Sequence, residues 1–194
     1  MIRNILKLFL HKKSTNLQKR FPQYPIGRGT YSPDLEVLSR KDGAALKIGA
    51  FCSIAAGVKI FLGGEHRVDW VTTYPFNVLW DAAKNIKRHP KTKGDVVIGN
   101  DVWIGNGAVI LSGVKIEDGS VIGARAVVSV DIPPYGIAVG NPVRIVKKRF
   151  DEDTIQRLLK IKWWNWNDER IEKTLPMLLN NDVESFLKAA EGEI

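Results

Sequence analysis

Aliphatic residues return at every sixth position through the middle of the chain, and small residues lie four places after most of them. A period of six fits neither the 3.6-residue turn of an α-helix nor the two-residue alternation of an ordinary strand. It is typical of a parallel β-solenoid, in which each hexapeptide supplies one short strand and one turn. The aliphatic series is Ile98, Ile104, Ile110, Ile116, Ile122 and Val128, and the small series is Val102, Ala108, Val114, Ser120 and Ala126.

The six-residue pattern also begins earlier in the chain. The run Ile26–Thr30 has the character of a first turn, and Ile48, Ile54 and Ile60 recur at the same interval. Further on, the run Asp131–Pro142 contains two consecutive prolines, which cannot continue a central ladder of hydrogen bonds. We therefore expect the solenoid strands to end at this run.

The pattern is interrupted once, because the distance from Ile60 to Ile98 is not a multiple of six. We interpret residues 63–95 as an inserted loop. Long loops inside compact domains are usually functional, and loops between repeats tend to build the binding surface. The first half of this loop is rich in aromatic residues, which argues for order. The basic stretch Lys84–Lys93 is interpreted as a solvated surface segment.

The N-terminal residues show an apolar stripe at helical spacing, formed by Ile2, Ile5, Leu6 and Phe9. No cleavage site follows, and the stripe is far too short to span a bilayer. We expect no signal peptide but a helix packed on the solenoid or on a neighbouring subunit, with peripheral membrane contact as the weaker alternative.

The C-terminal residues also have a helical character. Asp151 is suited to cap a helix, Trp163, Trp164 and Trp166 are interpreted as packing anchors, and a last helix is expected over residues 181–190. The predicted organisation is an N-terminal helical or irregular segment over 1–23, a β-helix domain over 24–148 with its insertion at 63–95, and a helical cap over 149–194.

The composition suits a globular protein, with 44% hydrophobic and 26% charged residues in 194. A net charge of +8 is compatible with a polyanionic partner. We nevertheless expect no nucleic acid, because the repeat carries no recognition motif and no basic and aromatic cluster.

The single cysteine, Cys52, excludes an intrachain disulfide and fits a reducing, cytoplasmic location. Its place at a small repeat position predicts a buried thiol.

Several motifs together resemble one family of enzymes. The motifs are Gly99–Ala108, Val121–Ala124, Asp131–Pro142, Gly64–His66, Thr72–Phe76 and Lys162–Trp166. The first three resemble hexapeptide-repeat acyltransferases of the left-handed β-helix type. The others resemble the xenobiotic acetyltransferase branch, which includes chloramphenicol and streptogramin acetyltransferases and many sugar O-acetyltransferases. The resemblance covers roughly residues 24 to 175.

The fold that this resemblance implies is mainly β. It is a single-stranded left-handed parallel β-helix of hexapeptide repeats, with an inserted loop and C-terminal α-helices. The handedness comes from the resemblance and not from the periodicity. The resemblance also implies a homotrimer with its active sites between subunits.

His66 matches the family's catalytic histidine. Acetyl transfer to a hydroxyl needs a general base, and imidazole is suited to that role near neutral pH. Glu65 and Asp69 are candidates to orient the ring. His11 and His89 lie in no motif and are interpreted as surface residues. We expect no metal, because the zinc enzymes of this fold need three histidine ligands and only His66 lies in a motif near the solenoid.

The resemblance further implies a groove for acetyl-CoA as cosubstrate. Trp103 matches the aromatic residue that packs along the pantetheine arm. Gly105 and Ala124 match turn positions where the backbone meets the pantetheine amides. Arg144 and Lys147 match the positions that reach the CoA phosphates.

One cofactor position departs from the family pattern. Many relatives have Thr-Lys before the double proline, whereas this chain has Ser129-Val130. One phosphate contact is therefore expected to be lost, with Arg125 and Lys148 as candidate replacements.

Three aromatic residues, Tyr31, Tyr74 and Phe76, match positions that line the family's acceptor pocket. Tyr74 is equally compatible with a packed aromatic that holds the loop. Overall, the resemblance implies an acetyl-CoA-dependent O-acetyltransferase acting by direct transfer, with His66 as general base. The expected acceptor is a hydroxyl of a sugar or polysaccharide precursor, or of an antibiotic.

Two alternatives remain open at this point. One is N-acetylation of a nucleotide-linked amino sugar, for which Lys84–Lys93 offers a basic surface. The other is a non-catalytic β-helix scaffold, which would require neither His66 nor a CoA groove.

Overall fold

The computed structural model describes residues 17–39 and 43–192. The chain divides into two compact units, the first ending at Lys147 and the second beginning at Lys148. The N-terminal apolar stripe and His11 lie outside the described residues. The first described element is the short helix α2, Leu17–Arg20. No helix in the described ranges is both long enough and apolar enough to cross a bilayer.

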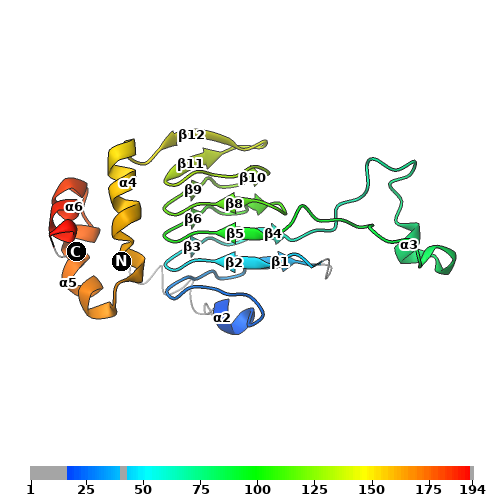
Figure 1. Ribbon diagram of the computed structural model, residues 1–194, viewed down its shortest axis with the longest axis horizontal. Helices are drawn as coiled ribbons and strands as arrows, with labels where there is room; N and C mark the ends of the chain where they lie inside the picture. Colours follow the sequence, from blue (N-terminus) through cyan, green and yellow to red (C-terminus); the bar gives the residue numbers. More distant parts are fainter. Residues whose placement is uncertain (1–16, 40–42, 193–194) are drawn as a thin grey trace. The chain divides into compact units, whose positions relative to one another are not determined.

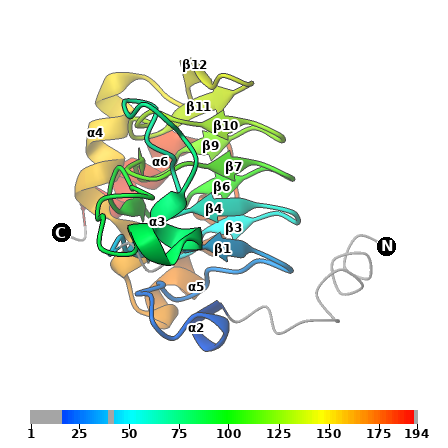
Figure 2. The same ribbon diagram turned by 90° about the vertical axis from the view of Figure 1, so that its right-hand side faces the viewer.

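Three sheets form the faces of the first unit (Figures 1 and 2). We call these sheets face A, face B and face C. Face A contains β3 Ser53–Ile54, β6 Trp103–Ile104, β9 Val121–Ile122, β11 Gly136–Val139 and β12 Arg144–Lys148. Face B contains β2 Leu46–Ile48, β5 Val96–Ile98 and β8 Lys115–Ile116. Face C contains β1 Glu36–Leu38, β4 Lys59–Phe61, β7 Val109–Ile110 and β10 Val127–Val128. From β1 to β10, consecutive strands pair in parallel with other coils and move from one face to the next. The last two strands, β11 and β12, both lie in one sheet.

The register of these sheets stacks the six-residue repeat into buried columns. On face A, Ile54 pairs with Ile104 and Ile104 with Ile122. Every aliphatic member of the repeat is at most 2% exposed. Since three hexapeptides complete one coil, each column takes every third member of the series. The parallel β-helix that the period predicted is thus confirmed. The columns on faces B and C are Ile48, Ile98, Ile116 and Ile60, Ile110, Val128.

The expectation that the strands end at Asp131–Pro142 is wrong. Ile132 still forms a parallel bridge with Ile116, and β11 and β12 continue face A beyond the prolines. Pro133 and Pro134 lie in the corner before β11, where a missing N–H removes no ladder bond. The Pro133 carbonyl there accepts hydrogen bonds from the Gly136 N–H at 3.0 Å and the Ser120 hydroxyl at 2.9 Å.

The inserted loop leaves the solenoid at the corner between face C and face B, after β4 and before β5 (Figure 1). Two backbone hydrogen bonds between Glu65 and Lys91, of 3.0 and 2.9 Å, close its base. The loop contains the short helix α3, Phe76–Leu79, and the 3-10 turn η1, Asp81–Ala83. Most of the basic stretch Lys84–Lys93 is exposed, as expected.

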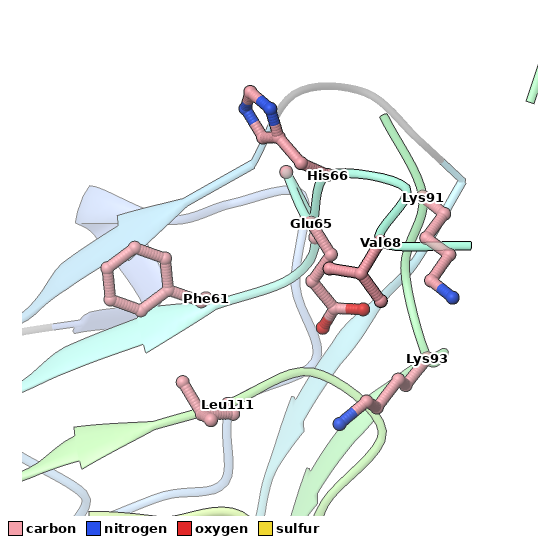
Figure 3. Close-up of a pocket in the computed structure, with 9 residues that line it drawn as sticks. Phe61, Glu65, His66, Val68, Lys91, Lys93 and Leu111 are labelled. Carbon is pink, nitrogen blue, oxygen red and sulfur yellow. The ribbon is translucent and has the colours of Figure 1, made fainter. Parts of the chain in front are cut away.

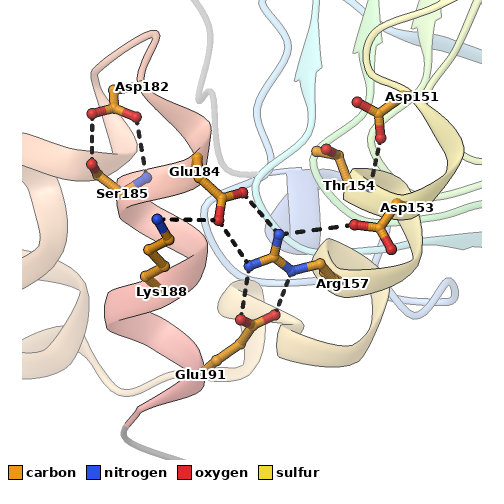
Figure 4. A network of polar contacts seen from close by, with 9 residues as sticks. All are labelled: Asp151, Asp153, Thr154, Arg157, Asp182, Glu184, Ser185, Lys188 and Glu191. Carbon is orange, nitrogen blue, oxygen red and sulfur yellow. Dashed lines mark hydrogen bonds and ion pairs between the residues drawn. The ribbon is translucent and has the colours of Figure 1, made fainter.

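The second unit contains the helices α4 Glu152–Ile161, α5 Asp168–Leu178 and α6 Val183–Glu191, with the 3-10 turn η2 Trp163–Asn165. Asp151 caps α4 as predicted, because its carboxylate accepts the Thr154 N–H at 2.8 Å. Arg157 ties α4 to α6 through ion pairs with Glu184 at 2.8 Å and Glu191 at 2.7 Å (Figure 4). Trp164 is 2% exposed, in keeping with a packing role.

Candidate active site

His66 lies just inside the inserted loop, and its ring is oriented by the main chain. Its Nδ1 atom is 2.7 Å from the carbonyl oxygen of Thr73. A carbonyl only accepts hydrogen bonds, so Nδ1 carries the hydrogen and Nε2 keeps a lone pair in the neutral ring. The side chain is exposed, so this lone pair is open to a ligand. This tautomer is the one that a general base requires.

Neither acid that the sequence offered is the hydrogen-bond partner of this ring. Glu65 and His66 are consecutive, and their side chains point to opposite sides of the backbone (Figure 3). The Glu65 carboxylate instead accepts the Ser112 hydroxyl at 2.5 Å. Asp69 accepts two hydrogen bonds from Arg67, which hold the pKa of its carboxyl well below the usual range. The orienting group is therefore a backbone carbonyl.

The interpretation of His89 as a surface residue is wrong. His89 is 5% exposed, and its ring centre lies 5.0 Å from that of His66 in an edge-on arrangement. Its Nε2 atom is 3.4 Å from the same Thr73 oxygen that His66 contacts. The cause is the pairing of Glu65 with Lys91, which folds the two arms of the loop together. Two imidazoles that are far apart in sequence thus share one acceptor.

A pocket of about 470 Å³ adjoins His66 at the corner between faces C and B. Its apolar wall is formed by Phe61 and Leu111, which follow in-register residues of β4 and β7. Figure 3 shows the Glu65 carboxylate pointing into this space and the Lys93 side chain extending toward it. The volume lies within the range typical of small-molecule sites. The pocket therefore has room for a ligand of modest size beside the histidine.

The residues predicted to hold the cofactor lie mainly on and around face A. Trp103 is 56% exposed on β6, in register with Val121 of the next coil. Gly105 and Ala124 lie at the corner between face A and face C. A Cβ atom at Gly105 would lie 2.5 Å from the Ala124 backbone nitrogen. Close packing of successive coils therefore requires this glycine, independently of any cofactor.

The predicted phosphate contacts fall at two different places. Arg144 and Lys147 are exposed on β12, the last strand of face A. Ser129 follows β10 and lies at the corner between faces C and B, the corner from which the inserted loop leaves. Within one chain, Ser129 is therefore on the His66 side of the solenoid and not on the Trp103 side.

The predicted acceptor residues are also divided. Tyr31 forms a parallel bridge with Ser53, which is in register with Trp103. Two strand spacings place it about 10 Å from Trp103 on the outside of face A. Tyr74 and Phe76 lie in the loop with ring centres 4.7 Å apart, and they are 48% and 39% exposed. Tyr31 therefore groups with the cofactor residues.

One full side of the solenoid separates His66 from Trp103 in a single chain. His66 follows the end of face C, whereas Trp103 lies on face A before face C begins. A hexapeptide spans at most about 20 Å when extended. The described residues thus present two separate groups of candidate residues, one with the histidine and its pocket and one with the exposed tryptophan. Nowhere in these ranges do three His, Cys, Asp or Glu side chains gather closely enough to hold a metal ion.

A parallel β-helix with an exposed histidine on an inserted loop is the arrangement expected of a hexapeptide-repeat acyltransferase. Comparisons with known proteins agree. The family model of the bacterial transferase hexapeptide (six repeats) matches residues 95–129. The chain is 42% identical over 147 residues to a chloramphenicol acetyltransferase of Agrobacterium fabrum, a match that covers 74% of this chain and 70% of the relative. It is 46% identical over 140 residues to a probable macrolide acetyltransferase of Lysinibacillus sphaericus, covering 70% and 78%.

Among solved structures, a maltose O-acetyltransferase from Clostridium difficile 630 is 26% identical, with a TM-score of 0.46 and coverage of 77% of this chain and 84% of that one. The identities to the curated relatives, over most of both chains, place the protein in a family. The chain belongs to the hexapeptide-repeat acetyltransferases, in the branch that contains the chloramphenicol acetyltransferases. The resemblance seen in the sequence is confirmed, and the scaffold alternative is set aside.

Proposed function

We propose that this enzyme is an acetyl-CoA-dependent O-acetyltransferase that acts on a small hydroxyl compound, with His66 as general base. The observation that carries the proposal is the hydrogen bond from His66 Nδ1 to the Thr73 carbonyl, which leaves Nε2 as a proton acceptor beside a pocket. The curated relatives are named for chloramphenicol and macrolides. Antibiotic hydroxyls are therefore the first acceptors to test, and sugars follow.

The reaction needs one proton to be moved twice. As the acceptor oxygen attacks the thioester carbonyl, its hydrogen passes to His66 Nε2 and a tetrahedral intermediate forms. When the intermediate collapses, the carbon–sulfur bond breaks and the imidazolium returns the proton to the departing thiolate. The products are the acetyl ester and CoA with a free thiol. The Thr73 carbonyl accepts the Nδ1 hydrogen bond throughout and keeps Nε2 facing the acceptor.

We further propose that the working site forms between subunits of a homotrimer. Two separate groups of candidate residues on different sides of one chain support this arrangement, because neither side alone carries both His66 and Trp103. In a closed ring, the loop side of one subunit would face the Trp103 side of its neighbour. Gly105, Ala124, Arg144 and Lys147 would then bind acetyl-CoA on the neighbour's surface. Ser129 would belong to the histidine side.

The test uses two single variants and their mixture. His66→Ala should lower kcat by about 10²- to 10⁴-fold, the usual effect of losing a general base, with acetyl-CoA affinity nearly unchanged. Trp103→Ala should raise KM for acetyl-CoA while kcat at saturation is largely kept. Thiol release from acetyl-CoA measures both, with chloramphenicol, a macrolide and simple sugars as acceptors. Turnover by His66→Ala at the wild-type rate would overturn the base assignment.

The mixture tests the shared site. Co-expressing His66→Ala with Trp103→Ala in equal amounts should restore roughly a quarter of the sites, since a site between subunits can draw both native residues from different chains. At low acetyl-CoA, the mixed protein should then exceed the mean activity of the two variants. Activity no higher than that mean would place both residues of a site in one chain.

A further inference from the structure

His89 is a buried imidazole beside the proposed base, and the chemistry above gives it no role. Its ring is 5% exposed and packs edge-on against the His66 ring, with centres 5.0 Å apart. Its Nδ1 atom is buried and has no hydrogen-bond partner in the described part of the chain. The polar interaction of this ring therefore runs through Nε2, which is 3.4 Å from the Thr73 oxygen.

The Thr73 carbonyl is thus approached by two imidazole nitrogens. Its oxygen has two lone pairs and donates nothing, so both facing nitrogens carry hydrogen. His66 Nδ1 makes the shorter contact, 2.7 Å against 3.4 Å for His89. The second donor holds the carbonyl from the other side and restricts its direction. The direction of this carbonyl determines which nitrogen of His66 stays protonated and where Nε2 points.

Other contacts fix His89 in place. The Trp70 ring lies 5.7 Å from the His89 ring, and the Arg67 guanidinium lies over Trp70 at 5.0 Å. The Asn77 side-chain amide donates to the His89 carbonyl at 2.6 Å. The side chains thus form a continuous row of contacts, in the order Arg67, Trp70, His89 and His66. A His89 ring held by these contacts restricts the positions that the neighbouring His66 ring can adopt.

We propose that His89 is a positioning residue for His66, acting through the Thr73 carbonyl and through edge-on ring packing. Its Nε2–H holds the carbonyl that accepts His66 Nδ1–H, and its ring limits rotation of the His66 ring. His89 itself does not touch the substrate. The inference rests on the proposed role of His66 as general base.

The experiment compares two substitutions that separate packing from hydrogen bonding. His89→Phe keeps a ring against His66 and Trp70 but removes the donor to Thr73. His89→Gln keeps a donor near the position of Nε2. His89→Phe should lower kcat by about 3- to 10-fold, the range for one lost hydrogen bond, with KM for acetyl-CoA unchanged. His89→Gln should recover most of that loss.

A spectroscopic measurement gives an independent answer. The ¹⁵N chemical shifts of the His66 ring distinguish the Nδ1–H tautomer from the Nε2–H tautomer. We expect Nδ1–H in the wild type and in His89→Gln, and a mixture in His89→Phe. Trp80→Leu is the matched control, because it removes an aromatic side chain of the same loop that packs on Phe76, with ring centres 5.1 Å apart. It should leave the His66 tautomer as in the wild type.

The outcomes separate this inference from the proposed function. Wild-type kcat and tautomer in His89→Phe would overturn the inference, provided that His66→Ala is inactive. Equal losses in His89→Phe and His89→Gln would also overturn it, because the donor would then be irrelevant. Full turnover by His66→Ala would overturn the proposed function first. Melting temperatures of all variants show that each one is folded before its kinetics are compared.

Discussion

Replacing Gly105 by alanine tests how closely the coils of the solenoid pack. Gly105 follows Ile104 at the corner between faces A and C, and its φ is not in the left-handed region. Its backbone conformation therefore does not require glycine. A Cβ atom there would lie 2.5 Å from the nitrogen and 2.9 Å from the Cα of Ala124, in the next coil. The substitution should therefore force two neighbouring backbones apart.

The magnitude follows from what can move. Carbon atoms in contact normally lie about 3.5–4.0 Å apart, so the overlap at Gly105 is about 1 Å. The Gly105 N–H donates to the Ile122 carbonyl at 2.8 Å, so separating the coils strains that ladder. Overpacking of this kind costs about 1–3 kcal/mol. Gly105→Ala should lower the free energy of unfolding of the solenoid by that amount.

Gly123 provides a matched control at the same position one coil later. A Cβ atom at Gly123 would meet Cγ1 of Val139 at 2.8 Å, and Val139 is 38% exposed. Because these contacts are with one side chain and the nearest backbone atom, the Ala138 oxygen, is 3.5 Å away, Gly123→Ala should cost about 1 kcal/mol, less than Gly105→Ala. Urea unfolding followed by circular dichroism of the β-signal measures both. Equal destabilisation, or a larger effect at Gly123, would refute the packing argument.

Two further predictions concern ionisable groups in each unit. Burial raises the pKa of the Cys52 thiol to about 11, so alkylation at pH 8 should be absent in the native protein and complete in urea; rapid native labelling would contradict the burial of this residue. The hydrogen bond from the Thr154 N–H lowers the pKa of Asp151, and the hydrogen bonds from Arg157 lower the pKa of Glu191. Both carboxylates therefore stabilise the folded helical unit at pH values above their unfolded pKa of about 4. This stabilisation is lost as the pH falls through their lower, folded-state pKa values. Thermal melts at 222 nm should show a helical transition that is lower at pH 3 than at pH 7, and identical melts would contradict this assignment.

Much of the solenoid could be predicted because its core repeats with the chain. Ile104 and Ile122 lie directly above one another, so one six-residue pattern determines strand, corner and register together. The cap of α4 was equally local, since Asp151 and Thr154 are within one turn. The prediction that the strands end at the double proline was wrong, because the six-residue pattern does not show whether Pro133 lies in a strand or in a corner. In a corner it removes no ladder bond.

The arrangement around His66 could be predicted only in part. The motif identifies the histidine, but its partner at Thr73 is a backbone oxygen, which any residue type would supply. His89 lies beside His66 because the backbone of Glu65 pairs with that of Lys91. No short-range sequence pattern predicts this pairing. Glu65 itself pointed elsewhere because neighbouring side chains alternate along an extended segment.

The inserted loop keeps His66 close to the strands of the solenoid. The strands on both sides of the loop keep their registers, with Ile60 paired to Ile110 and Ile48 to Ile98, so the interruption does not disturb the core. Loop closure becomes only slowly more costly with length, and the Glu65–Lys91 pair closes this loop at its base. His66 is the next residue after that closure. The proposed base therefore lies at the closed end of the loop, and the candidate acceptor residues Tyr74 and Phe76 lie farther along the chain.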